Sequence, residues 1–70
     1  MPGFPAAGTR ILVVEDDPDL LALIDLSLTE IGCHVHRSSS ARDALEVLTR
    51  DRFDVVVTDG KLRDVLVRIK

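Results

Sequence analysis

The chain has very few aromatic residues and a single cysteine. Among its 70 residues there is no tryptophan and no tyrosine, and there are only two phenylalanines, so aliphatic side chains must supply nearly all of the core. Cys33 cannot form an internal disulfide, which is compatible with a reducing compartment. A chain this short buries only about 60% of the surface that its unfolded form exposes, so we expect one domain of marginal stability.

The chain also lacks an excess of basic residues and a long apolar run. Its formal net charge is −3, whereas a nucleic-acid surface needs a basic face, so we expect no direct nucleic-acid binding. No apolar run approaches the roughly 20 residues that a membrane span needs. The first residues have neither the charged nor the apolar region of a signal peptide. We therefore expect a cytoplasmic protein with a disordered leader over 1–8 and one domain over 9–70.

The sequence contains two short apolar runs that are each followed by carboxylates. Residues 53–58 (Phe-Asp-Val-Val-Val-Thr) run into Asp59 and a glycine, and residues 11–14 (Ile-Leu-Val-Val) run into Glu15 and Asp16. Short apolar runs bounded by turn signals are typical of strands buried on both faces of a parallel sheet. In such a sheet the reactive crevice lies beyond the carboxyl ends of the strands. The sequence therefore predicts Glu15, Asp16 and Asp59 at one rim.

A helix is expected directly after the first strand, which we place over 9–14. Asp17 is suited to the N-cap position and Pro18 to the first helical position, while Gly32 is a typical helix stop. Apolar residues at helical spacing define the face that we expect to pack on the sheet as core rather than form a partner groove. They are Leu20, Leu23, Ile24, Leu28 and Ile31.

The second strand is expected at a sheet edge, because residues 33–37 alternate between apolar and polar. Cys33 belongs to the core side, as a small apolar residue. His34 and His36 fall on the exposed side, at a spacing that can bind a metal. Without a third ligand nearby, we interpret them as surface histidines.

A second helix follows the turn that we expect at residues 38–40. Ser40 and Asp43 resemble a capping box with aspartate in place of glutamate. The buried stripe expected for this helix consists of Ala41, Ala44, Leu45 and Leu48. The third strand then begins at Phe53.

Strand, helix, strand, helix and strand make two successive βαβ units of an α/β protein. Right-handed crossovers place the helices on opposite faces if the winding direction reverses after the second strand. The polar second strand suits an edge, so the predicted order is 2-1-3 in a doubly wound parallel sheet. Residues 62–70 fit either a helix or an alternating strand, and we favour a helix because a crossover helix should come next.

The run from Ile11 to Pro18, followed by Phe53 to Asp59, resembles the receiver domain of two-component response regulators over roughly residues 9–61. The resemblance implies a flavodoxin-like fold in which Asp59 is phosphorylated by a histidine kinase or phosphotransfer protein. It implies a Mg²⁺ site formed by Glu15, Asp16, Asp59 and the backbone carbonyl of Lys61. It further implies a phosphorelay phosphoacceptor rather than an enzyme.

The chemistry of clustered carboxylates agrees with this interpretation. Formation of an acyl phosphate needs a carboxylate nucleophile. Several carboxylates within a few ångströms repel one another, and a hard divalent cation resolves that conflict. Magnesium favours carboxylate oxygens together with retained waters.

The chain also departs from the family pattern. Receivers are nearly twice as long, and they bind the phosphoryl group with a serine or threonine and a lysine on later strands. No serine or threonine follows Asp59 here, and the later lysines are Lys61 and Lys70. We therefore expect a truncated receiver whose third strand presents an unpaired edge. This predicts a homodimer formed through that edge or by exchange of residues 62–70.

Two other functions remain open from the sequence. The half-fold could be a phosphorylation-incompetent module for dimerisation or partner docking. A phosphatase with an aspartyl nucleophile is less consistent, because such enzymes carry a second acid two residues from the nucleophile, where this chain has Val57 and Lys61.

Overall fold

The computed structural model describes residues 7–58 of the chain, in which three strands alternate with two helices. In chain order these elements are β1 (Arg10–Val14), α1 (Pro18–Glu30), β2 (His34–Ser38), α2 (Ala41–Arg50) and β3 (Val55–Thr58). Residues 1–6 of the leader expected over 1–8 lie outside the described residues, as do the ambiguous segment 62–70, Asp59 and Lys61. None of the helices within residues 7–58 is long and apolar enough to cross a membrane.

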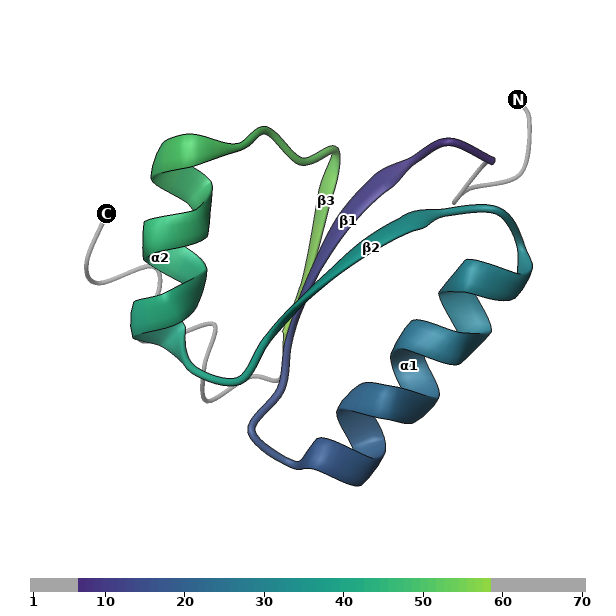
Figure 1. Ribbon diagram of the computed structural model, residues 1–70, viewed down its shortest axis with the longest axis horizontal. Coiled ribbons are helices and arrows are strands. Elements are labelled where there is room, and N and C mark those ends of the chain that lie inside the picture. Colours follow the sequence, from purple (N-terminus) through teal and green to yellow (C-terminus); the bar gives the residue numbers. More distant parts are fainter. Residues whose placement is uncertain (1–6, 59–70) are drawn as a thin grey trace.

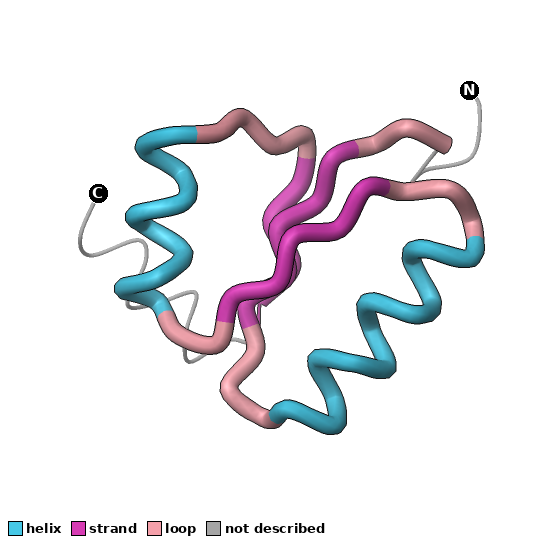
Figure 2. The backbone as a smooth tube through the Cα atoms, viewed as in Figure 1, coloured by secondary structure: helices cyan, strands magenta, loops and turns pink. Residues whose placement is uncertain are grey.

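The three strands form a parallel sheet in the order β2-β1-β3. The helices lie on opposite sides of this sheet, with α1 and α2 separated by the strands in Figure 1 and in the tube view of Figure 2. This arrangement confirms, over residues 7–58, the predicted doubly wound, flavodoxin-like parallel sheet. It follows from right-handed crossovers whose direction reverses after β2.

Each face of β1 contributes to a separate apolar core, because successive side chains of a strand point to opposite faces. On the α1 side the buried residues are Ile11, Val13, Leu21 and Cys33, against which Ile24, Leu28, Val35, Val55 and Val57 pack. On the α2 side they are Leu12, Val14, Ala44 and Val47, with Leu48 and Phe53 packed against them. The central position of β1 explains why its residues from Ile11 to Val14 are at most 1% exposed.

Both ends of α1 carry the capping groups that the sequence predicts. The Asp17 carboxylate accepts hydrogen bonds from the amides of Asp19 (2.9 Å) and Leu20 (3.3 Å), so two of the unpaired donors of the first turn are satisfied. At the other end Gly32 has a φ of 94° and the Cys33 amide donates to the Leu28 carbonyl. This is a Schellman motif, and it needs a residue that tolerates positive φ.

A capping box has two hydrogen bonds, and the start of α2 forms one of them. The Asp43 amide donates to Ser40 Oγ at 3.1 Å, as expected for an N-cap serine. The Asp43 carboxylate accepts from Ser38 Oγ at 2.8 Å. Aspartate is shorter than the glutamate of a capping box, and here it reaches the end of β2 instead.

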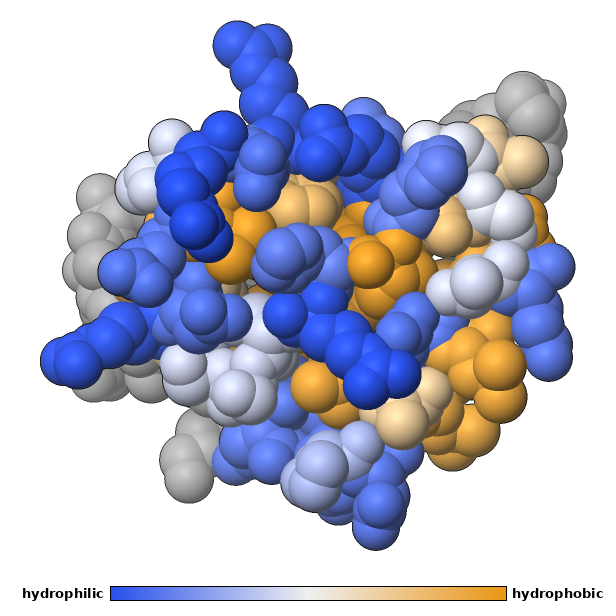
Figure 3. Space-filling model, in the orientation of Figure 1, coloured by the Kyte–Doolittle hydropathy of each residue, from blue (hydrophilic) through white to orange (hydrophobic). Residues whose placement is uncertain are grey.

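The predicted core face of α1 is wrong at three of its positions. Leu20, Leu23 and Ile31 are 42%, 59% and 50% exposed, whereas Leu21, which the prediction omitted, is 7% exposed. The helix is rotated relative to the prediction, so Leu21 lies against the sheet, with Ile24 and Leu28 packed against the same core. In Figure 3, apolar side chains show at the surface in the region where α1 runs in Figure 1.

Smaller corrections apply to the other elements. Ser38 is the buried last residue of β2 rather than part of a turn, and β3 begins at Val55 rather than at Phe53. In α2, Val47 is buried and Leu45 only half-buried. The third strand is not buried on both faces, since Val56 is 40% exposed. Within residues 7–58, β3 pairs only with β1, so it lies at an edge of the sheet.

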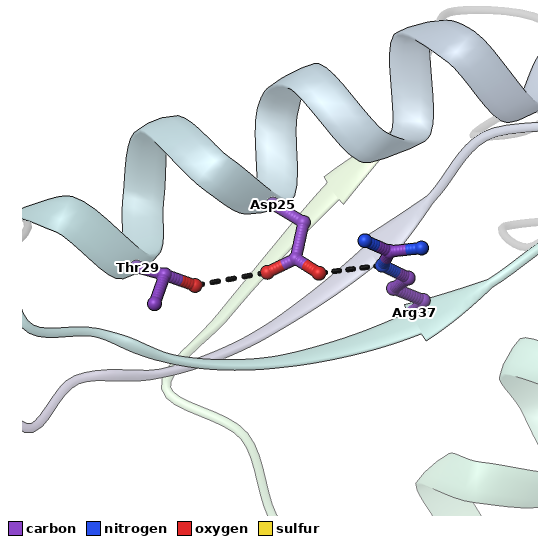
Figure 4. A network of polar contacts seen from close by, with 3 residues as sticks. All are labelled: Asp25, Thr29 and Arg37. Atoms are coloured by element: carbon purple, nitrogen blue, oxygen red, sulfur yellow. Dashed lines mark hydrogen bonds and ion pairs between the residues drawn. The ribbon is translucent and has the colours of Figure 1, made fainter.

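An ion pair ties α1 to the edge strand β2 (Figure 4). Arg37 Nε donates to one oxygen of the Asp25 carboxylate at 2.5 Å, and Thr29 Oγ1 donates to the other at 2.9 Å. The hydrogen bond from Arg37 is the main cause that lowers the pKa of Asp25. Because Asp25 and Leu21 are one turn apart, this contact sits beside the α1 core and favours the observed rotation of the helix.

Candidate functional site

The carboxyl ends of β1 and β3 lie side by side in the sheet. Val14 and Thr58, the last residues of the two strands, are direct partners in the parallel register. The next residues along the chain are Glu15 and Asp59, the acids singled out in the sequence. Asp59 itself lies outside the described residues, so the structure gives the position of one acid and of the strand end that leads to the other.

Glu15 is the anchored acid of the site. Its side chain is 7% exposed, and the described part of the chain has no other carboxylate that is this buried. Its amide donates to the Ser38 carbonyl at 3.0 Å, and its Oε2 accepts from the Asp17 amide at 3.0 Å. These contacts hold the carboxylate at the strand end and fix its orientation.

Asp16 and Asp17 differ in their roles. Asp16 is exposed in the loop between β1 and α1. The Asp17 carboxylate accepts from the first turn of α1, which confirms its interpretation as a helix cap. Glu15 and Asp16 are therefore the two described acids that remain available at this rim.

These two acids suit a hard cation by their chemistry. Mg²⁺ is bound in proteins through one or two carboxylates and several waters, and Glu15 and Asp16 supply such oxygens on consecutive residues. Within residues 7–58 no group of three or more potential ligands comes together. Two of the four predicted ligand positions, Asp59 and Lys61, fall outside that range, so the predicted ligand set stays a prediction.

Ser38 borders the site and was missed by the sequence interpretation. It is 2% exposed. Its hydroxyl has two acceptors within hydrogen-bond distance, the Ser40 carbonyl (3.0 Å) and the Asp43 carboxylate (2.8 Å). Its own carbonyl accepts from Glu15, so Ser38 connects the loop after β1 to the start of α2. A serine at the end of an alternating strand is a weak signal, because the same residue type is common in turns.

The two histidines lie on the exposed side of β2, as predicted. The His36 ring makes an edge contact with the Phe53 ring, with centroids 5.9 Å apart, and the Arg10 guanidinium stands 5.4 Å from the same ring. Arg10 opens β1, so this group lies toward the amino ends of the strands. It is at the opposite end of the sheet from Glu15.

The chain is similar to known proteins over most of its length. The family model described as the response regulator receiver domain matches residues 11–66. The chain is 35% identical over 65 residues to the two-component response regulator ARR11 of Arabidopsis thaliana, covering 90% of this chain and 12% of the relative. It is 38% identical over 56 residues to the transcriptional regulatory protein GlrR of Escherichia coli, covering 80% of this chain and 13% of the relative.

A third relative, the response regulator protein PilR of Pseudomonas aeruginosa, is 31% identical over 55 residues, which cover 79% of this chain and 12% of the relative. The chain thus spans only about an eighth of the length of the curated relatives that it matches. No solved structure matches it.

Proposed function

Because the chain belongs to the response regulator receiver family, we propose that it is a Mg²⁺-dependent phosphoacceptor of a phosphorelay, with Asp59 as the residue that is phosphorylated. The donor is the phosphohistidine of a histidine kinase or phosphotransfer protein. In this proposal the chain accepts the phosphoryl group in the cytoplasm, is not itself an enzyme and does not contact nucleic acid.

The observation that carries the proposal is the pairing of Val14 with Thr58. Parallel strands that end level with each other deliver the residues that follow them to the same rim. Glu15 is held there by its contacts with Ser38 and Asp17, so one acid of the site is already oriented before any ligand binds. An acid that is held in advance loses little freedom on binding, which favours a specific site.

The proposed transfer moves one phosphoryl group from a histidine of the donor protein to Asp59 of this chain. An oxygen of the Asp59 carboxylate attacks the phosphorus, and the bond between phosphorus and the histidine nitrogen breaks. The imidazole nitrogen keeps the electron pair and later takes a proton from solvent. The product on this chain is an acyl phosphate at Asp59, formed by nucleophilic attack of a carboxylate.

Glu15 and Asp16 are the described residues that would hold Mg²⁺ in this proposal, together with Asp59 and the carbonyl of Lys61. When bound, the cation neutralises the carboxylates and the incoming phosphoryl oxygens. Glu15 contributes a fixed oxygen and Asp16 an exposed one, so Asp16 can adjust to the cation or to the waters around it.

Phosphorylation by a small donor tests this function directly. The chain is incubated with acetyl phosphate or with beryllofluoride, with and without Mg²⁺, and is examined by intact mass spectrometry and by ¹⁵N–¹H NMR. We expect Mg²⁺-dependent addition of one phosphoryl group, shifted amides around Glu15 and Asp16, and loss of both effects in Asp59→Asn. An unmodified wild-type chain with unshifted amides would instead favour the phosphorylation-incompetent docking module.

The position of β3 at the edge of the sheet supports a second part of the proposal, which is self-association. In residues 7–58 β3 has a strand partner on one side only, and unpaired strand edges are sites of association. We propose a homodimer formed through this edge or by exchange of residues 62–70. Light scattering coupled to size-exclusion chromatography tests it, and a folded monomer at micromolar concentration would reject it.

A further inference from the structure

The outer surface of α1 carries an apolar face that the described part of the chain does not cover. Leu20, Leu23, Leu26 and Ile31 are 42%, 59%, 59% and 50% exposed, and we call these four residues the leucine face. Three of them follow one another at three-residue spacing, so they lie along one side of the helix. Apolar surface is visible in the region of α1 (Figures 1 and 3).

The leucine face lies away from the contact between α1 and β2. Leu23 and Asp25 are two positions apart, which places them about 160° apart around the helix axis. Asp25 faces Arg37 of β2, so Leu23 is on the far side of α1. Isolated exposed leucines need no explanation, but three exposed leucines along α1, with Ile31 just past its end, form a larger apolar surface of the kind that marks interaction sites.

The surroundings of the leucine face are acidic. From Glu15 to Glu30 the chain has six acids and no lysine or arginine. Asp25 is paired with Arg37, whereas Asp16, Asp19 and Glu30 are exposed around α1. A partner for this surface therefore needs apolar side chains flanked by positive charge.

One segment of the same sequence has that chemistry. Residues 61–70, which lie outside the described residues, contain four basic residues and a single acid. The basic residues are Lys61, Arg63, Arg68 and Lys70. Leu62, Val65, Leu66 and Ile69 recur at the spacing of one helix face. The segment thus matches the leucine face both in its apolar spacing and in the sign of its charge.

The topology favours a segment from another molecule. A right-handed crossover that continues from β3 to the outer side of the sheet carries the chain over the face occupied by α2. The leucine face is on α1, which lies on the other side of the sheet (Figure 1). A second copy brings its own basic segment without that restriction, and a two-fold arrangement satisfies both copies at once.

We propose that the leucine face of α1 is the docking site for residues 61–70 of a second copy of this chain. Each copy provides one basic segment and one leucine face, so the contact is reciprocal. Docking on the leucine face is a specific form of the exchange of the C-terminal segment, in place of pairing through the β3 edge, and it does not depend on phosphorylation of Asp59.

Paramagnetic labelling of one copy tests where the segment docks. One copy, at natural isotope abundance, carries Cys33→Ala and Val67→Cys, so that a nitroxide can be attached at position 67 of its basic segment. This spin-labelled copy is mixed with ¹⁵N-labelled wild-type chain. We expect broadening of the amides of α1 that increases with the concentration of the spin-labelled copy. Broadening confined to α2 or to β3, or none at concentrations where dimer is present, would overturn the proposal. So would a chain that stays monomeric throughout.

Matched surface variants give a second measurement. Leu23→Ser removes an apolar side chain from the leucine face, and Val56→Thr changes an exposed apolar residue on the opposite side of the sheet. We expect the dimer dissociation constant to rise about tenfold in Leu23→Ser and to stay unchanged in Val56→Thr. The reverse result would place the interface at β3. Circular dichroism confirms folding of each variant, and Leu26→Ser replaces Leu23→Ser if the latter is unfolded.

A charge exchange separates docking from general loss of stability. Arg68→Glu should weaken the dimer about tenfold, and combining it with Glu30→Arg should restore part of the affinity. Glu30 is the last residue of α1, where a positive charge is favoured by the helix dipole, so this change does not oppose folding. Asp59→Asn should leave the dimer intact even though it abolishes phosphorylation. Additive weakening in the double variant would contradict the proposal.

Discussion

The Asp25 carboxylate on α1 accepts a hydrogen bond from Arg37 Nε on β2, and this pair joins the helix to the edge strand (Figure 4). Arg37 is about half exposed, so the pair is worth little in free energy, of the order of 0.5 kcal/mol. The pair is formed in the same rotation of α1 that buries Leu21, because Asp25 and Leu21 are one turn apart on the helix. The pair favours one rotation of α1.

Asp25→Asn should destabilise the fold by about 0.5 kcal/mol at neutral pH. Arg37 lowers the pKa of Asp25 in the folded chain, so the carboxylate stabilises the fold above the unfolded pKa of about 4. That stability is lost as the pH falls through the lower pKa of the folded state. Urea unfolding at several pH values should show the difference between wild type and variant shrinking in acid. A difference that stays constant with pH would contradict this origin.

Glu15→Gln should keep the fold and weaken Mg²⁺ binding about tenfold or more. The amide oxygen of glutamine can still accept from the Asp17 amide, which the wild-type carboxylate does at 3.0 Å, but the charge that attracts the cation is gone. Titration with Mg²⁺ followed by NMR measures the affinity. Glu15→Ala is the control, since it also removes the acceptor and should lower the stability of the fold. Equal Mg²⁺ affinity in wild type and Glu15→Gln would exclude Glu15 as a ligand.

Leu12→Ala should destabilise the chain by about 2–5 kcal/mol, because Leu12 is fully buried between β1 and α2 and its loss leaves a cavity. This is comparable to the whole stability of so short a domain, so we expect the variant to be largely unfolded. Leu26→Ala removes the same atoms from a leucine that is 59% exposed, and in dilute protein it should change stability by less than about 0.5 kcal/mol. Thermal unfolding followed by circular dichroism checks both values.

Gly32→Ala should cost more than Gly8→Ala, although both glycines have positive φ. The backbone strain is similar, of the order of 1 kcal/mol, since φ is 94° at Gly32 and 85° at Gly8. A Cβ at Gly32 would also lie 3.1 Å from the Ala7 Cβ, whereas one at Gly8 would meet nothing within 4 Å. Midpoints of thermal unfolding for the two variants test the order. Equal midpoints would mean that the contact with Ala7 relaxes without cost.

The features that could be predicted from the sequence are those that one or two residues determine. Asp17 with Pro18 marks the start of α1 and Gly32 its end, because each supplies a group or a backbone angle that few other residues provide. The alternation around Val35 identifies an edge strand, and the order β2-β1-β3 follows from it. Glu15 was placed correctly at a strand end, because the apolar run of residues 11–14 stops directly before it.

The rotation of α1 could not be predicted. Leu20, Leu21 and Leu23 offer overlapping apolar stripes, so helical periodicity alone does not decide which one meets the sheet. The choice depends on contacts between segments that are distant in sequence, chiefly the packing of Leu21, Ile24 and Leu28 in the core on the α1 side. The local sequence also does not show that Glu15 is buried and Asp16 exposed, or that the Glu15 amide bonds to the Ser38 carbonyl at the end of another strand.

The central place of β1 has a consequence for the order of events during synthesis. Among the described elements this strand is the first to be made, yet β3, its neighbour on one side, is the last. Until then the apolar side chains of Ile11 to Val14 have only part of their cover, and the rim next to Glu15 has no opposing strand. The pairing of Val14 with Thr58, which brings the two strand ends level, can therefore form only in this late step, and the unpaired edge of β1 favours capture by chaperones before that point.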